Sequence, residues 1–80
     1  MLEELASRDK VIGVKQSRRA IAEGKAAKVF FACDADGAVI EGLRRGCAEQ
    51  GVPTEEDHSM SEIGRACRIS VGAAVAVLLK

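Results

Sequence analysis

Two apolar segments constrain the fold of this 80-residue chain more than any other feature. Residues 29–33 read Val-Phe-Phe-Ala-Cys, and residues 71–79 hold only apolar side chains and one glycine. Strands that are covered on both faces have continuous apolar runs, so both segments are predicted to be strands, and the longer one is expected at the centre of a sheet. The longer run has nine residues, whereas a membrane-spanning helix needs about 20. No membrane association is therefore expected.

The rest of the chain alternates between expected helices and strands. Helices are predicted over 2–6, 16–23, 38–50 and 59–67, and strands over 10–14 and 52–58. Gly24 and Gly51 are expected to end two helices, and Asp36 to begin one. Val39 and Met60 are predicted to lie on inner helix faces. Alternation of this kind predicts one α/β domain over residues 1–80: a three-layer α/β/α sandwich with a mixed sheet of about four strands.

The cysteines and the single histidine offer no chemistry of their own. Cys33, Cys47 and Cys67 are widely spaced, without a CxxC pair or a His/Cys cluster, so no zinc site is expected. Each lies in an apolar stretch and is predicted to be a buried, reduced thiol. No nucleophile–base pair, Walker spacing or GxGxxG loop is present. We therefore expect no metal, no cofactor and no enzyme activity.

Charge is unevenly distributed along a chain whose formal net charge is zero. Residues 8–28 carry seven basic and two acidic side chains, and residues 63–80 carry three basic ones. Residues 29–62 carry eight acidic and two basic side chains, and residues 1–7 carry two acidic ones. Phosphates respond to the local patch, because charges are screened over about 8 Å in physiological salt. The two basic blocks, folded side by side, predict a nucleic-acid footprint.

The segment from Gly13 to Arg19 lies where a strand is predicted to turn into a helix. Lys15, Gln16 and Arg19 are neighbours at helical spacing and point to one side of the helix start. Unpaired backbone N–H groups and the helix dipole add positive potential there. Lys and Arg donate to guanine O6 and N7, and Gln both donates and accepts. This set suits the edges of purine bases beside phosphates.

Three segments together carry a family resemblance: residues 13–21, residues 32–36 and residues 63–74. In this order they resemble the kink-turn-binding ribosomal protein family, which includes the archaeal large-subunit protein seven-Ae and short bacterial relatives. The resemblance implies an α/β/α sandwich that binds kink-turns, RNA internal loops with tandem sheared G·A pairs beside a sharp bend. It implies that Lys15, Gln16 and Arg19 contact the G·A pairs. The loop that packs on flipped-out nucleotides is matched by Arg68, Ile69, Ser70 and Val71.

The sequence departs from the family pattern in the third segment. Arg68 stands where glycine is usual, and Ser70 stands where an acid is usual, so both changes add positive potential. The interpretation is a non-catalytic, monomeric, cytoplasmic protein that binds kink-turn RNA and is associated with the ribosome or another ribonucleoprotein. Gly13 would allow close approach of another backbone, Lys28, Arg65 and Arg68 would meet phosphates, and Ile69 and Val71 would cover the loop. The alternative is a protein–protein interaction module of the same fold that uses the acidic residues 34–62.

Overall fold

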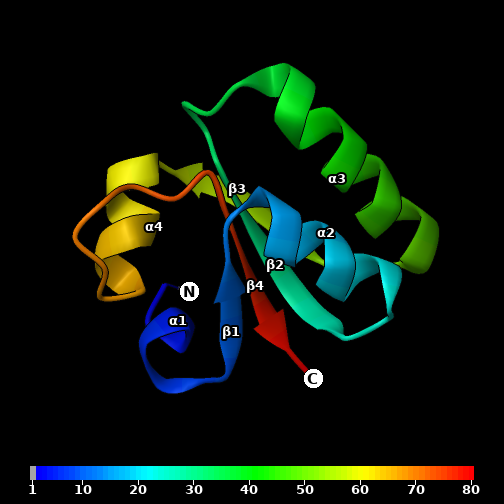
Figure 1. Ribbon diagram of the computed structural model, residues 1–80, viewed down its shortest axis with the longest axis horizontal. Helices are drawn as coiled ribbons and strands as arrows, with labels where there is room; N and C mark the ends of the chain where they lie inside the picture. Colours follow the sequence, from blue (N-terminus) through cyan, green and yellow to red (C-terminus); the bar gives the residue numbers. More distant parts are fainter. Residues whose placement is uncertain (1) are drawn as a thin grey trace.

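The two apolar segments form the centre of a four-stranded sheet in the computed structural model, which describes residues 2–80 (Figure 1). Strands β2 (Ala26–Ala32) and β4 (Val75–Leu79) are antiparallel neighbours. The edge strands are β1 (Lys10–Ile12), antiparallel to β4, and β3 (Thr54–His58), parallel to β2. The order β1-β4-β2-β3 therefore confirms the predicted mixed sheet with apolar central strands.

Helices cover both faces of this sheet, which confirms the α/β/α sandwich. Helices α2 (Val14–Ala22) and α3 (Gly37–Gln50) lie on one face, and α1 (Glu4–Ser7) and α4 (Met60–Ala66) lie on the other (Figure 1). Adjacent residues of β2 divide between the two cores, because successive side chains of a strand point to opposite faces. Phe31 packs under α2 and α3, and Phe30 packs under α1 and α4; both are fully buried.

Local signals set the ends of the helices. Asp36 begins α3, as predicted, and its side chain accepts a hydrogen bond from the Ala38 N–H at 2.9 Å. Ser59 begins α4 through a capping box with Glu62, at the start of the helix predicted over 59–67. Gly24 and Gly51 adopt φ of 71° and 68° just past α2 and α3. These values lie in the left-handed region that glycine enters without steric cost, so both predicted helix ends are confirmed.

The last strand is shorter than predicted. It begins at Val75, and residues 71–74 belong to the loop that follows α4. The Ala73 N–H donates to the Met60 carbonyl at 3.1 Å, so this loop is held against the start of α4 before the chain enters the sheet. Val71 is 68% exposed as a result. The apolar residues 71–74 belong to a packed loop. A short apolar run by itself does not distinguish such a loop from a buried strand.

Three burial predictions are wrong. Cys33 follows the end of β2 and is exposed, whereas Cys47 and Cys67 are buried as predicted, and burial raises the pKa of both thiols. Val39 and Met60 lie in the first turns of α3 and α4 and are 37% and 36% exposed. The buried stripe of α3 is formed by Ile40, Leu43 and Cys47. Val39 precedes Ile40 by about 100° of helix rotation, which carries it to the margin.

Candidate nucleic-acid interface

The three segments that carry the family resemblance approach one another at one end of the sheet. The Gly13 N–H donates to the Val75 carbonyl at 3.0 Å, which joins the start of α2 to the start of β4. The Ala32 N–H donates to the Ala74 carbonyl at 2.8 Å, which brings the end of β2 to the same place. In Figure 1 the chain leaves β1 and enters β4 at this end. The first residues of the segments 13–21 and 32–36 and the last residue of the segment 63–74 therefore lie at the same end of the sheet.

The start of α2 presents polar side chains and uncapped backbone groups. Gly13 is the N-cap residue with φ of 98°, and glycine supplies no side chain to accept from the first turn. Lys15 and Gln16 are exposed in that turn, and the Arg19 side chain is 76% exposed one turn later. The helix dipole adds partial positive charge at this end. The arrangement can donate hydrogen bonds to phosphate oxygens and to base edges.

The loop after α4 is held tightly against that helix. Arg68 adopts the left-handed region with φ of 63°, and it is the one non-glycine residue of 2–80 with positive φ. The N–H groups of Arg68 and Ile69 donate back to the Arg65 and Gly64 carbonyls at 3.0 and 3.1 Å. A residue with left-handed backbone angles directly after a helix is usually a glycine. The left-handed φ therefore places Arg68 at a position whose backbone conformation favours glycine.

Two glycines allow the close packing of this loop. A Cβ at Gly64 would overlap the Val71 carbonyl oxygen and come within 3.1 Å of the Gly72 Cα. A Cβ at Gly72 would come within 3.1 Å of the Met60 Cβ. The sequence motif contained both glycines, but their roles depend on this contact between α4 and the loop. Sequence reasoning missed them as residues that shape the interface.

The side chains of the loop have different environments. Val71 is exposed, whereas Ile69 is half-buried and packs against the core under α1 and α4. Arg65, Arg68 and Ser70 are exposed. A hollow of about 180 Å³ lies between α4 and the loop, and it is lined by Ser61, Arg65, Ile69, Ser70, Val71 and Gly72. Four of the predicted loop-side residues, Arg65, Ile69, Ser70 and Val71, therefore line one hollow, and Val71 is its exposed apolar side chain.

Lys28 does not lie with the other predicted site residues. It pairs in register with Leu78, three residues along β4 from Val75. Its ammonium lies 2.9 Å from the Glu55 carboxylate and 3.5 Å from Glu4, and 5.0 Å from the centre of the Phe30 ring. The hydrogen bond to Glu55 raises the pKa of Lys28. This lysine neutralises internal carboxylates on the face covered by α1 and α4.

The acidic strand β3 is largely neutralised by neighbouring basic groups. Lys28 and His58, whose Nε2 lies 2.6 Å from the carboxylate, hold the pKa of Glu55 down to about 2. Arg44 donates to both carboxylate oxygens of Glu56, at 2.6 and 3.1 Å. Asp57 stays exposed on this edge strand. Glu55 and Glu56 of the acidic block are therefore paired with basic side chains, whereas Glu49 and Asp57 of the same block are exposed.

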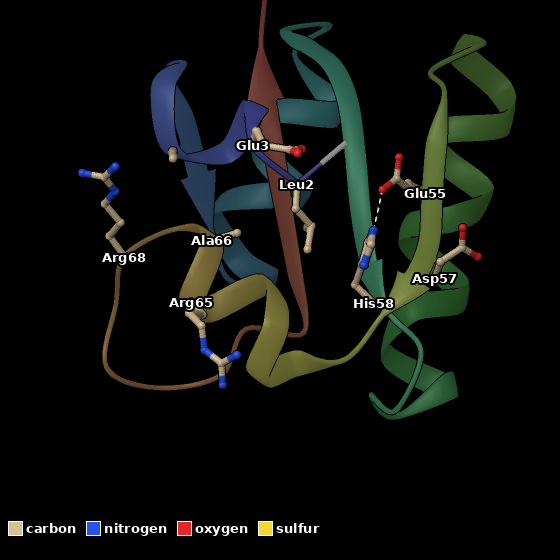
Figure 2. Close-up of a pocket in the computed structure, with 9 residues that line it drawn as sticks. Leu2, Glu3, Glu55, Asp57, His58, Arg65, Ala66 and Arg68 are labelled. Carbon is tan, nitrogen blue, oxygen red and sulfur yellow. Dashed lines mark hydrogen bonds and ion pairs between the residues drawn. The ribbon is translucent and has the colours of Figure 1, made fainter.

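A cavity of about 610 Å³ lies between α1, β3 and α4, on the face of the sheet opposite α2. Its lining combines Leu2, Ala6 and Ala66 with the charged or titratable residues Glu3, Glu55, Asp57, His58, Arg65 and Arg68. Figure 2 shows that Arg65 and Arg68, at its rim, extend away from it toward solvent. Within residues 2–80, no group of His, Cys, Asp and Glu side chains is arranged to hold a metal ion.

The fold defines this chain as a small α/β/α sandwich of a kind seen in solved structures. The Giardia lamblia 15.5kD RNA binding protein superimposes with a TM-score of 0.88 at 32% identity, over 99% of this chain and 68% of that one. A Bacillus halodurans protein of unknown function has the same TM-score at 20% identity, over 99% and 83% of the two chains. The second likeness concerns the fold alone. No helix of residues 2–80 is long and apolar enough to cross a membrane.

The model of the Ribosomal protein L7Ae/L30e/S12e/Gadd45 family matches residues 2–80, and this chain belongs to that family. An RNA-binding protein of Geobacillus kaustophilus is 47% identical over 70 residues, which cover 88% of this chain and 85% of the relative. RNA-binding protein YbxF of Geobacillus stearothermophilus is 44% identical over the same shares. The resemblance predicted from the three sequence segments is confirmed.

Proposed function

We propose that this protein is a non-catalytic RNA-binding protein that recognises kink-turns in a ribosomal or other ribonucleoprotein RNA. The observation that carries the proposal is the 3.0 Å hydrogen bond from Gly13 to Val75, which joins both motif-bearing segments at one edge. RNA-binding relatives with up to 47% identity over most of their length support the same reading. In this proposal residues 1–80 act as one monomeric domain in the cytoplasm.

Each group has a separate task in the proposed complex. Lys15, Gln16 and Arg19 read the exposed edges of the sheared G·A pairs, because their donors and acceptors match purine edges. The uncapped N–H groups at the start of α2 face a phosphate. The exposed Val71 covers a splayed nucleotide by apolar contact, while Arg65 and Arg68 meet phosphates nearby. Regular A-form helices hide their base edges in a deep groove, so a bent internal loop is the better target.

Binding to paired RNA ligands tests this proposal. A gel shift compares a kink-turn RNA with the same RNA whose tandem G·A pairs are replaced by Watson–Crick pairs. The unsubstituted protein is expected to prefer the intact kink-turn. Arg19→Ala is expected to lose about 1–3 kcal/mol of binding free energy toward it. Arg45→Ala, which removes the same charge from an exposed site on α3, serves as the matched control. Equal affinity for the two RNAs would sink the proposal.

The ion pairs of β3 argue against the alternative role, a protein–protein module that uses the acidic residues 34–62. Glu55 and Glu56 already have basic partners within 3 Å, and separating them would expose those partners without a counter-charge. Reversing the charges of Glu55, Glu56 and Asp57 separates the two functions. Kink-turn binding is expected to survive in a variant of this kind that remains folded. Loss of a protein partner together with absent RNA binding would favour the alternative.

A further inference from the structure

A carboxylate lies inside the proposed basic interface. Glu23 follows the last residue of α2, and both of its carboxylate oxygens have basic partners. Oε2 accepts from the Arg19 Nε at 3.1 Å, and Oε1 lies 3.1 Å from the Lys25 Nζ. Arg19 belongs to the predicted base-reading set, so this acid is in direct contact with a residue proposed to touch RNA.

The backbone fixes this three-residue arrangement. Gly24 turns the chain with its left-handed φ of 71°, and the Lys25 N–H then donates to the Ala20 carbonyl at 2.9 Å. This turn returns Lys25 to the end of α2 beside Glu23. The helix dipole disfavours a negative side chain at a helix C-terminus. Glu23 is therefore held there by Arg19 and Lys25 and not by any preference of the helix, and hydrogen bonds from Lys25 and Arg19 lower the pKa of Glu23.

The same residues line a groove between α2 and the edge strand β1. This groove has a volume of about 200 Å³, and its wall includes Gln16, Arg19, Glu23 and Lys25. Gln16 and Arg19 therefore share one surface with the carboxylate. An arginine carries five N–H donors in a rigid plane. The contact through Nε occupies one of them and leaves the terminal Nη1 and Nη2 groups for a bidentate contact with guanine O6 and N7.

We propose that Glu23 is a positioning residue that holds Arg19 in the orientation for base reading and thereby raises discrimination between kink-turns and other RNA. This inference rests on the proposed function. Glu23 acts through Arg19. Its bond to Nε restricts a long side chain that is otherwise 76% exposed, so less rotamer freedom is lost when Arg19 binds a base edge.

Glu23→Gln removes the charge and keeps the size and one acceptor oxygen. With both RNAs of the gel shift described above, the ratio of affinities for intact and substituted kink-turn is expected to fall about two- to fivefold, the range for an exposed ion pair. Asp57→Asn is the matched control, because it removes one exposed negative charge from β3, at the opposite edge of the sheet. That variant is expected to keep the wild-type ratio. Urea denaturation of both variants shows that they remain folded.

A double variant tests whether Glu23 acts through Arg19. Arg19→Ala combined with Glu23→Gln is expected to show the same ratio as Arg19→Ala alone. A further fall in the double variant contradicts a positioning role. A ratio in Glu23→Gln that equals or exceeds the wild-type ratio overturns the inference and leaves the proposed function standing. Equal binding of the two RNAs by the unsubstituted protein overturns the proposed function, and the role of Glu23 with it.

Discussion

Gly64→Ala is expected to destabilise this protein although it replaces glycine inside a helix. Gly64 lies in α4, is buried and has ordinary helical backbone angles. At an exposed helix position, alanine is about 1 kcal/mol more favourable than glycine. At residue 64 the added Cβ would overlap the Val71 carbonyl oxygen and press on Gly72. The obstacle is backbone, so the loop has to move away from the helix.

The expected loss follows from what the loop would give up. Overpacking of a close contact costs about 1–3 kcal/mol. Displacement of the loop also strains the hydrogen bonds from Ile69 to Gly64 and from Ala73 to Met60, each of which contributes about 1 kcal/mol. The higher helix propensity of alanine offsets about 1 kcal/mol of this destabilisation. The net change in unfolding free energy is therefore a loss of about 1–3 kcal/mol.

Urea denaturation followed by circular dichroism measures this change. Gly42→Ala is the matched control, because residue 42 lies inside α3 and a Cβ there meets no atom of another residue within 4 Å. The control is expected to gain about 1 kcal/mol. A Gly64→Ala protein that is as stable as the wild type would refute the packing argument. Weaker binding of kink-turn RNA by this variant is expected too, because the displaced loop carries Val71 and Arg68.

Arg68→Gly is expected to raise the unfolding free energy by about 1 kcal/mol, because φ of 63° costs a residue with a side chain about that much. The same variant is expected to lower the salt dependence of RNA binding by about one phosphate contact. Unchanged stability would contradict the first of these two expectations. Ser17→Ala is expected to stabilise the protein by about 1 kcal/mol in thermal unfolding, since the buried Ser17 hydroxyl has no hydrogen-bond partner among the described residues. Glu55→Gln is expected to lose about 1–2 kcal/mol at neutral pH. Lys28 depresses the pKa of Glu55 from 4.5 to about 2, so this contribution is present above pH 4.5 and disappears as the pH falls toward 2 in urea titrations of both proteins. A difference that persists at pH 2 would argue against the ion pair as its source.

Local sequence signals predicted most of the fold. The apolar runs predicted as strands at 29–33 and 71–79 supply residues 29–32 and 75–79 of the central strands, and Asp36, Gly24 and Gly51 mark helix ends as expected. These features depend on interactions within a few residues, such as a cap to the next turn or a glycine in the left-handed region. The error at residues 71–74 arose because the loop packs against α4, where the Ala73 N–H donates to the carbonyl of Met60, thirteen residues earlier in the chain.

The candidate site also contains residues that the sequence predicts and residues whose place depends on the tertiary structure. Lys15, Gln16 and Arg19 follow from helical spacing alone, which places them on one side of α2. Lys28 belongs to the same basic block of sequence, but its position in β2 places it beside Glu55, on the other face of the sheet. Glu23 counted in the sequence only as one of two acids among basic residues, whereas its contacts with Arg19 and Lys25 depend on the turn at Gly24.

The sequence by itself determined the sandwich, the polar start of α2 and the family, because periodicity, caps and motif order are properties of the chain read in one direction. Only the tertiary structure decided which charges are free. Ion pairs form wherever the fold brings opposite charges within 4 Å, and Glu55 and Glu56 of β3 are paired in this way with Lys28 and Arg44. The zero net charge is a sum over equal numbers of acidic and basic side chains, whereas the fold decides which of them are paired and which, like Lys15 in the first turn of α2, are exposed.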